Sequence, residues 1–472
     1  MIARLDCEGA DGAVQTVVSD GTWEQVESPV VADNFRVGET GTGVRDGRTF
    51  GAAVEMTGPK GALEPEPHHP TKVVRELTPV GLERLADGAW RVTFGENVTG
   101  WVRSRLRGLA RGATVTFVYD ECLDEPRALG VFQRDVQTAR YIAGGAAEET
   151  FAPRFTYYGF RFLTVRGLAE APRKEDFTAC VVRTSFPKTG RFTCSDADFN
   201  ALFAATERSF EGNFTVGFPT DCPHREKNGW MADAAMAVEF GLLDYGMAAD
   251  YRKWLQDIMD AQRPSGMIPA IVPTCGWGSF IFDGCGYGPV WDSAPYAVVH
   301  GLWRHCGDTA SVRLAYDMLE RHFAFAETQI DADGLVGKFN GDHAARNDLQ
   351  PDNRYCCTAY HLFNAERLAE LAEALGDARR SETCRAAATR LRRALVRHFY
   401  RGGGVWDDGR ETAQALAVDL ALAPPGEAAA TAARLVRAVE AEDGHFSFGI
   451  VGSRHLLRAL SKVGRTDLAF AG

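Results

Sequence analysis

The chain has 472 residues, 45% of them hydrophobic, which is enough material for two or three packed domains. Asp and Glu number 63 against 52 Lys and Arg, and the net charge of −11 argues against nucleic acid or an anionic membrane as a partner. The 11 cysteines have no zinc-type spacing, and we predict neither a bound metal nor another cofactor. No apolar run reaches membrane-spanning length.

The first 185 or so residues are predicted to be β structure. Short segments rich in β-branched and aromatic residues are bounded by Gly, Asp or Pro, as at 13–18, 90–94, 100–104, 113–119 and 160–166. This spacing favours antiparallel β-sandwiches over βαβ units. The proline-rich stretch 58–70 marks a boundary. The N-terminus has no signal-peptide pattern and the cysteine count is odd, so we expect a cytoplasmic protein with reduced thiols.

Residues 217–233 hold a dense set of polar side chains. Prolines and a glycine predict an irregular loop in the first part, and the residues from Asp233 onward have the apolar spacing of a helix. In such a layout Asp233 caps free N–H groups, Arg225 keeps a neighbouring carboxylate ionised and Trp230 offers a flat apolar wall, as in a sugar pocket. The same residue types also fit an ordinary capped and salt-bridged helix start.

Helical periodicity starts at Asp196 and continues almost to the end of the chain. Apolar residues recur at three- and four-residue steps in nine segments, which are 196–210, 233–260, 293–306, 309–328, 356–375, 378–399, 411–421, 427–440 and 453–461. Short loops join most of them. This pattern predicts an incomplete α/α toroid, in which inner helices surround a cleft and outer helices brace them.

Two segments between these helices carry further candidate residues. The loop 271–294 is too rich in glycine for a helix and too aromatic for a linker, which is typical of functional loops. Its Trp277, Tyr287 and Trp291 are placed to stack on the apolar face of a deoxy-sugar, although each also fits core packing. The second segment ends in Asp342 and His343.

The string Asp-Cys-Pro-His-Arg-Glu-Lys-x-Gly-Trp-x-x-Asp at 221–233 resembles the signature of the α-L-rhamnosidases of glycoside hydrolase family 78. Segments 94–101, 139–144 and 153–162 resemble landmarks of the β-sandwich that precedes the catalytic domain in that family. The fold class implied by the resemblance is an N-terminal antiparallel β-sandwich region followed by an (α/α)6-type toroid that is incomplete at its C-terminus.

The resemblance implies three domains. Residues 1–70 are assigned to a remnant of an N-terminal β-sandwich accessory domain and its linker, and 71–188 to the concanavalin-like β-sandwich. Residues 189–472 are assigned to the six-hairpin (α/α)6 glycosidase catalytic domain without its C-terminal part. We therefore expect the chain to be truncated at both ends.

The resemblance also implies roles for single residues. Glu226 matches the general acid, and Asp221 and Asp233 match carboxylates that bind rhamnose hydroxyls. A close arginine favours the ionised form of a carboxyl group, which is the wrong form for an acid. We therefore expect Arg225 to pair with Asp221 or Asp233 and a sugar hydroxyl, which leaves Glu226 against Trp230 or another aromatic ring.

Trp291, Asp342 and His343 complete the predicted substrate-binding set. Segment 291–294 resembles a tryptophan-bearing pocket segment of the family. His343 stands where the family commonly has the tryptophan of Gly-Asp-Trp, so a histidine replaces an indole in one predicted wall of the pocket. A structural His343 stays open beside a functional one.

The family inverts the anomeric centre with a base glutamate that follows a Gly-Arg-x-Asp-Leu-Ala stretch. This chain has that stretch at 464–469 and ends at Gly472, so we expect the general base to be absent from it. The predicted function is release of terminal α-L-rhamnose from rhamnosides by an inverting general acid/base mechanism, with a carbohydrate as the partner. An apolar edge after Leu468 predicts a poorly soluble chain or a homodimer unless something covers it.

Two other classes of function stay open at this stage. A lyase on rhamnose–uronate oligosaccharides needs a basic residue such as His224, His343 or Arg225 near the uronate carboxylate. A carbohydrate-binding protein without turnover agrees with the missing base. Hydrolysis of an aryl α-L-rhamnoside, compared with formation of an unsaturated uronate, separates the three functions.

Overall fold

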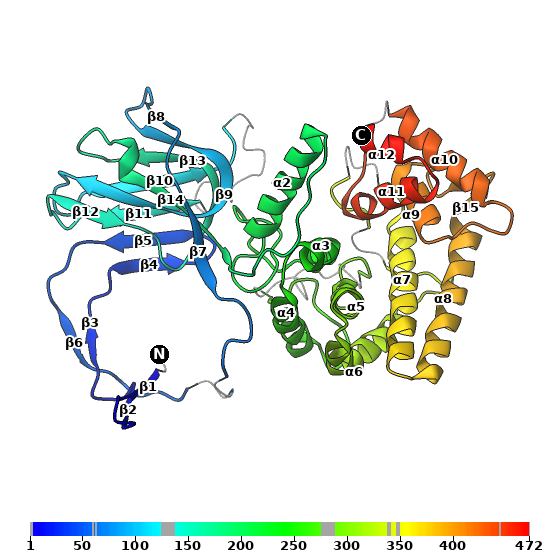
Figure 1. Ribbon diagram of the computed structural model, residues 1–472, viewed down its shortest axis with the longest axis horizontal. Coiled ribbons are helices and arrows are strands. Elements are labelled where there is room, and N and C mark those ends of the chain that lie inside the picture. The colour runs from blue at the N-terminus through cyan, green and yellow to red at the C-terminus, as the bar shows by residue number, and fades with distance from the viewer. Residues whose placement is uncertain are drawn as a thin grey trace. The chain divides into compact units, whose positions relative to one another are not determined.

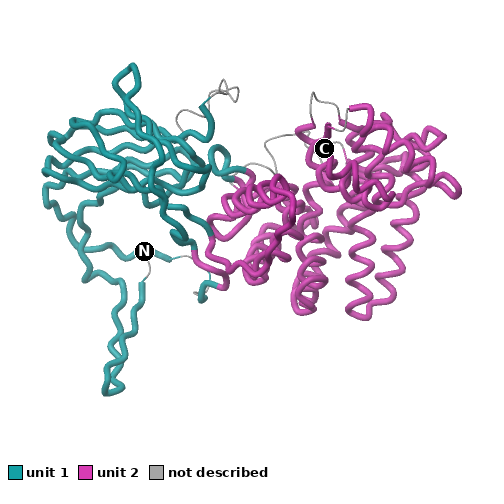
Figure 2. The backbone as a smooth tube through the Cα atoms, turned by 45° about the horizontal axis from the view of Figure 1, so that its top comes forward, with its two compact units in different colours: residues 1–66, 71–183, 222–227 teal, residues 67–70, 184–221, 228–472 magenta. Residues whose placement is uncertain are grey.

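The computed structural model describes residues 3–58, 61, 64–123, 137–274, 288–337, 341–345, 350–442 and 445–471. The chain divides into two compact units, neither of which is continuous in sequence (Figure 2). The β unit comprises Met1–Glu66, Thr71–Arg183 and Cys222–Lys227, and the helical unit comprises Pro67–Pro70, Thr184–Asp221 and Asn228–Gly472. The predicted change from strands to helices along the chain is confirmed.

In the described part of the β unit, ten strands form one continuous sheet (Figure 1). They run in the order β4-β5-β11-β10-β13-β9-β14-β7, and β8 and β12 pair with β9 outside that path. Their bounds are Val30–Asn34 (β4), Gly38–Thr42 (β5), Thr71–Leu77 (β7), Gly81–Arg84 (β8), Trp90–Arg107 (β9), Thr114–Asp120 (β10), Thr138–Ile142 (β11), Glu148–Phe151 (β12), Tyr158–Arg166 (β13) and Phe177–Thr184 (β14). Strand β10 shows why they form, because Val115, Phe117 and Tyr119 alternate into the core of the sheet.

The long strand β9 connects the parts of this sheet by pairing with β8, β12, β13 and β14. In its middle, a Cβ atom on Gly100 would lie 1.9 Å from the carbonyl oxygen of Cys180 on β14, so the close approach requires glycine. One pairing departs from the antiparallel prediction, because β5 and β11 run parallel with Arg140 opposite Thr40. Residue alternation does not encode strand direction, and the long connection between these two strands permits the crossover that a parallel pair needs.

Two short ladders occupy the N-terminal part of the β unit. Strand β1 (Arg4–Glu8) pairs with β2 (Val14–Val18), and β3 (Glu24–Val26) pairs with β6 (Thr49–Ala52). Every residue of these four strands is exposed. Their stability therefore cannot come from a buried apolar face of their own. The unit also holds a 3-10 turn, η2 (Lys174–Asp176).

The described part of the helical unit contains eleven helices and one small hairpin. The helices are α2 (Ala197–Gly212), α3 (Met231–Asp244), α4 (Ala248–Ala261), α5 (Ala294–Cys306), α6 (Thr309–Glu327), α7 (Asn353–Ala374), α8 (Ala378–Phe399), α9 (Glu411–Asp419), α10 (Ala428–Ala441), α11 (Ile450–Lys462) and α12 (Thr466–Ala471). The hairpin pairs β15 (Tyr400–Gly402) with β16 (Val405–Trp406). None of the described helices is both long and apolar enough to cross a lipid bilayer.

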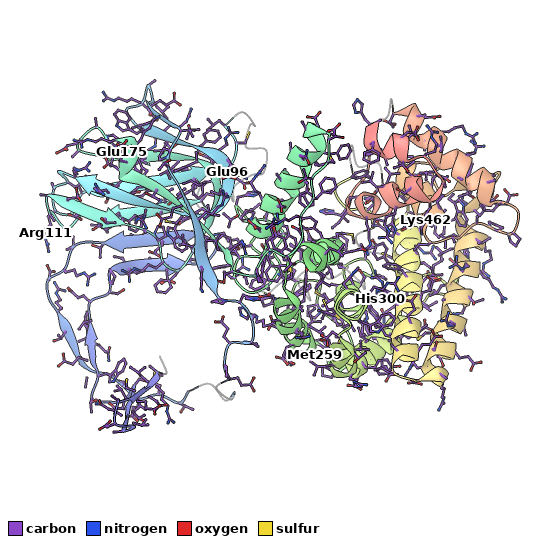
Figure 3. All side chains as sticks on the ribbon, in the orientation of Figure 1. Glu96, Arg111, Glu175, Met259, His300 and Lys462 are labelled. Atoms are coloured by element: carbon purple, nitrogen blue, oxygen red, sulfur yellow. The ribbon has the colours of Figure 1, made fainter. Side chains whose placement is uncertain are left out.

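The helices alternate between two layers, as the toroid prediction requires. Helices α3, α5, α7, α9 and α11 contact one another in succession, and α6, α8, α10 and α12 each pack on the helix before them. Lys462 lies at the end of α11 (Figure 3), and its Nζ donates to the carbonyl oxygen of Asp419 on α9 at 2.6 Å. This hydrogen bond connects α11 with α9. The first layer is the more buried, and its N-terminal ends carry the candidate site.

One helix prediction is wrong, and one helix was not predicted. The single helix expected over 233–260 is two helices, because Tyr245 is extended and ends α3. The carbonyl oxygen of Asp244 there accepts hydrogen bonds from the amides of Thr189 and Gly190 at 2.9 and 2.8 Å, so a distant segment replaces the next helical turn. The helix that was not predicted is α12, which has only six residues.

Candidate active site

The segment that carries the predicted sugar-binding residues is closed by two hydrogen bonds. The amide of Asp221 donates to the carbonyl oxygen of Asn228 at 3.0 Å, and the amide of Asn228 donates to Oδ1 of Asp221 at 2.9 Å. The next residue, Gly229, lies so close to Val272 that a Cβ atom would sit 2.0 Å from the carbonyl oxygen of Val272. The two ends of the loop Cys222–Lys227 are therefore held together, and the chain beyond it is fixed by a contact that only glycine permits.

A cavity of about 460 Å³ in the helical unit brings together two of the predicted residues. Asp221 and Asp233 both line it. Its wall also includes a group of apolar side chains from α2, α3, α11 and the residues after α2, namely Phe210, Phe214, Met236, Phe240 and Ile450. Two carboxylates in a largely apolar hollow suit a ligand that carries both hydroxyls and an apolar group.

Asp233 reaches this cavity from the first turn of α3. The helix begins at Met231, and its N-cap residue is Trp230, which makes no side-chain cap. Asp233 is therefore the third residue of the helix and not its N-cap. A carboxylate in the first turn is nevertheless favoured by the helix dipole, so the position suits an ionised Asp233 that faces the cavity.

Glu226 lies on the loop Cys222–Lys227, which belongs to the β unit. Its backbone is held on both sides, because the amide donates to Sγ of Cys222 at 3.4 Å and the carbonyl oxygen accepts from Nε of Arg36 at 2.9 Å. Its side chain forms an ion pair with its neighbour, and Nη2 of Arg225 lies 2.9 Å from Oε1 of Glu226. The expectation that Arg225 avoids Glu226 is therefore wrong for this structure.

The histidine of the same loop is also paired. Nδ1 of His224 lies 2.8 Å from Oε2 of Glu121, and Asn97 donates to the other oxygen of Glu121 at 3.0 Å. Burial opposes ionisation of Glu121, but the contacts with His224 and Asn97 outweigh it and lower the pKa of that carboxyl. Since His224 and Arg225 both have acidic partners, the contacts do not favour the lyase alternative.

Three of the predicted rings form a row in the helical unit. The ring centroids of Trp230 and Trp291 are 6.4 Å apart and those of Trp291 and His343 are 6.0 Å apart, both edge to face. Trp291 is 2% exposed, whereas Trp230 is half-buried and His343 is exposed. Trp230 and His343 therefore keep accessible surface, whereas Trp291 is buried and contacts both of them. Trp277 and Tyr287 lie outside the described residues.

Asp342 is fully buried, and hydrogen bonds occupy both of its oxygens. Oδ1 accepts from the amides of Val451 and Gly452 at 2.7 and 3.0 Å, and Oδ2 accepts from the Thr412 hydroxyl at 2.6 Å and the Gly449 amide at 3.0 Å. The side chain therefore joins the starts of α9 and α11. This arrangement favours a supporting role for Asp342 over the predicted direct contact with the sugar.

Family profiles match both described units. The profile of the bacterial alpha-L-rhamnosidase six-hairpin glycosidase domain matches residues 187–472, and that of the bacterial alpha-L-rhamnosidase concanavalin-like domain matches residues 83–183. The chain belongs to the bacterial α-L-rhamnosidase family. The resemblance read from residues 221–233 is thereby confirmed, as is the order of a concanavalin-like domain followed by a six-hairpin domain.

Individual relatives agree with this family. An α-L-rhamnosidase of Streptomyces avermitilis is 28% identical over 491 residues, with 100% of this chain and 46% of that protein covered, and one of Formosa agariphila is 26% identical with 98% and 52% covered. A crystal structure of the Streptomyces avermitilis α-L-rhamnosidase with L-rhamnose has a TM-score of 0.87 at 27% identity, covering 100% of this chain and 46% of that chain. The α-L-rhamnosidase from Dictyoglumus thermophilum shares the fold at a TM-score of 0.90 and 24% identity, covering 100% and 55%. The chain spans about half the length of the curated relatives it matches.

Two buried ionisable residues of this rhamnosidase-family chain could not be assigned a role from the sequence. Lys227 directly follows Glu226 and is fully buried, and burial lowers the pKa of its ammonium group to about 7. Glu411 at the start of α9 is also buried, and burial raises the pKa of its carboxyl to about 7 despite a hydrogen bond from the Ser447 amide. Lys227 lies within the matched signature at 221–233, which is a signal that could have identified it. Nothing in the sequence around Glu411 indicates that its carboxyl is buried.

The described residues contain no group of three or more His, Cys, Asp or Glu side chains that could hold a metal ion. Glu366, a carboxylate on α7, pairs with Arg392 at 2.8 Å. This ion pair gives Glu366 a structural partner.

Proposed function

We propose that this chain takes part in the hydrolysis of terminal α-L-rhamnosides. The observation that carries the proposal is the cavity in which Asp221 and Asp233 face an apolar wall, in a chain of the bacterial α-L-rhamnosidase family. A methylpentose has hydroxyls for the two carboxylates and a methyl group for the apolar wall. The relative from Streptomyces avermitilis that was solved with L-rhamnose supports this sugar as the ligand.

We further propose that Glu226 protonates the leaving oxygen in an inverting reaction. Cleavage of a glycosidic bond needs a proton for that oxygen and a carboxylate that activates water. Arg225 leaves Glu226 when a sugar hydroxyl becomes its new partner, so binding of the substrate prepares the acid. We assign the water-activating carboxylate to none of the residues that the structure describes.

Hydrolysis of p-nitrophenyl α-L-rhamnopyranoside tests the proposal, with the matching α-D-mannoside and β-D-glucoside as controls. The proposal expects release of rhamnose from the first compound only, and proton NMR of the fresh product should show the β anomer before mutarotation. Release of the α anomer first would overturn the inverting mechanism. Equal turnover of all three glycosides, or formation of an unsaturated uronate from a rhamnose–uronate disaccharide, would overturn the assignment to rhamnosides.

A further inference from the structure

Lys227 is buried in a way that is rare for a lysine. Its side chain has no exposed surface, and its backbone has a positive φ of 51°. Lysine is almost never fully buried without an acidic partner. Among the described residues, however, no carboxylate forms an ion pair with Lys227. Burying a charged group without an acidic partner is unfavourable for folding. The contacts of the Lys227 ammonium group indicate the role that this burial serves.

Neutral oxygens and aromatic faces of the β unit surround the ammonium group. Nζ donates to the carbonyl oxygens of Tyr157 and Phe35 at 2.6 and 2.9 Å and to the Thr156 hydroxyl at 3.2 Å. The rings of Tyr157, Tyr158 and Phe35 lie 4.8, 5.4 and 5.6 Å from Nζ, within cation–π range. Three acceptors match the three N–H donors of an ammonium group, so the cage can satisfy the charged form, although burial lowers the pKa of Lys227 to about 7.

The residues of this cage are fixed independently of Lys227. The Thr156 hydroxyl donates to the carbonyl oxygen of Phe35 at 2.8 Å, which joins the two segments that supply the acceptors. The side chain of Asn34 accepts from the amides of Arg36 and Val37, both at 2.9 Å, and orders the turn after β4. Because these contacts already order the cage, the cage fixes the position of the Lys227 ammonium group inside it.

The same turn also holds Glu226 directly. Arg36 adjoins Phe35, and its Nε donates to the carbonyl oxygen of Glu226 at 2.9 Å. Two consecutive residues of the signature loop, Glu226 and Lys227, are thus attached to two consecutive residues of one turn. The attachment acts on the backbone of Glu226 and leaves its side chain to meet Arg225 or a substrate.

We propose that Lys227 is a positioning residue whose ammonium group locks the loop Cys222–Lys227 into the β unit and thereby sets the place of the Glu226 carboxyl. The inference rests on the proposed function for its catalytic consequence, since it takes Glu226 as the acid. The anchoring itself does not depend on that role.

Hydrogen exchange tests the anchoring without any assay of activity. Lys227→Met keeps most of the stem and removes the charge and the donors, and Lys174→Met is the matched control, because Nζ of Lys174 donates to a carbonyl oxygen of the same unit at 2.7 Å. In Lys227→Met, the amides of residues 222–228 should exchange at least tenfold faster than in the wild type, whereas the exchange rates of β9, β10 and β13 should not change. In Lys174→Met, the exchange rates of the loop should stay at their wild-type values. Unaltered exchange in the loop would overturn the anchoring. If Lys227→Met fails to fold, Arg36→Met must show the same local change, and its absence would overturn the inference.

Activity then tests the consequence for Glu226. Loss of acid positioning should lower kcat at least tenfold more on methyl α-L-rhamnoside than on 2,4-dinitrophenyl α-L-rhamnoside, whose leaving group needs little protonation. The effect of Lys227→Met should also vanish in a Glu226→Gln background. Equal losses on both substrates, or additive effects, would overturn the positioning role. A wild-type chain that cleaves neither substrate, even with azide supplied as the nucleophile in place of base-activated water, would refute the proposed function instead, and the exchange result would still decide the anchoring.

Discussion

Nη2 of Arg225 lies 2.9 Å from Oε1 of the adjacent Glu226, so the proposed acid is paired with the residue before it in the chain. Both side chains keep some exposure, at 32% and 23%, and an ion pair of this kind contributes little to stability. The pair is therefore easily opened by a ligand that offers Arg225 another partner. Under the proposed function, a sugar hydroxyl that pairs with Arg225 would release Glu226, so sugar binding and acid chemistry would be coupled through Arg225.

We predict that Arg225→Gln weakens binding of L-rhamnose by about 10- to 100-fold, because a hydrogen bond from a charged donor contributes about 1.5 to 3 kcal/mol. Isothermal titration with L-rhamnose measures this change. Arg166→Gln, which removes an exposed arginine of the β unit that pairs with Asp87, is the control and should bind as the wild type does. Unchanged affinity in Arg225→Gln would mean that Arg225 stays with Glu226 and does not contact the sugar.

Asp233→Asn should also weaken rhamnose binding by about 10-fold or more, since a neutral amide replaces a charged acceptor that faces the cavity. The helix dipole effect in the first turn of α3 predicts a stability loss of only about 0.5 kcal/mol. Titration and thermal unfolding of the same variant separate the two effects. A large loss of stability with normal affinity would place Asp233 among the structural residues.

Asp342→Asn should reduce stability far more than affinity. Four hydrogen bonds reach this buried carboxylate, and an amide accepts through one oxygen only, so we expect a loss of about 3 kcal/mol in the free energy of unfolding. Urea unfolding measures it, with Asp317→Asn as an exposed control. Normal stability combined with lost rhamnose binding would restore the direct sugar contact predicted from the sequence.

Glu411 predicts a pH dependence of stability. Burial raises its pKa from 4.5 to about 7, so between these values the folded chain binds more protons here than the unfolded chain. The stability from this group is therefore fully present below about pH 4.5 and is lost as the pH rises through about 7. Glu411→Gln should unfold like the wild type near pH 4.5 and be more stable by about 1 to 3 kcal/mol at pH 8. A difference between the two proteins that is independent of pH would contradict the burial of an acidic group at this position.

Much of the architecture could be predicted because its signals are local. Asp196 caps α2 through hydrogen bonds from the amides of Asp198 and Phe199, as its position before an apolar period indicated. The alternation of β10 and the signature at 221–233 were likewise readable within short windows. Each of these features depends on residues that are neighbours in the chain.

The features that could not be predicted depend on partners far away in the sequence. The end of α3 is set by hydrogen bonds from Thr189 and Gly190, and the cage of Lys227 is built from residues 35 and 156–158. From the sequence, Asp342 is predicted to bind the sugar, but its four hydrogen bonds to residues 412 and 449–452 indicate a structural role. The pairing of Arg225 depends on side-chain geometry, which residue types alone do not determine.

The most direct test of the central claim is the leaving-group dependence of Glu226→Gln. The amide keeps the shape of the side chain but cannot donate the proton, so kcat on methyl α-L-rhamnoside should fall by about 10²- to 10⁴-fold. On 2,4-dinitrophenyl α-L-rhamnoside the loss should be within about tenfold, because that leaving group departs without protonation. Affinity for L-rhamnose should stay near the wild-type value. Equal losses on the two substrates would contradict the account and assign the acid to another residue.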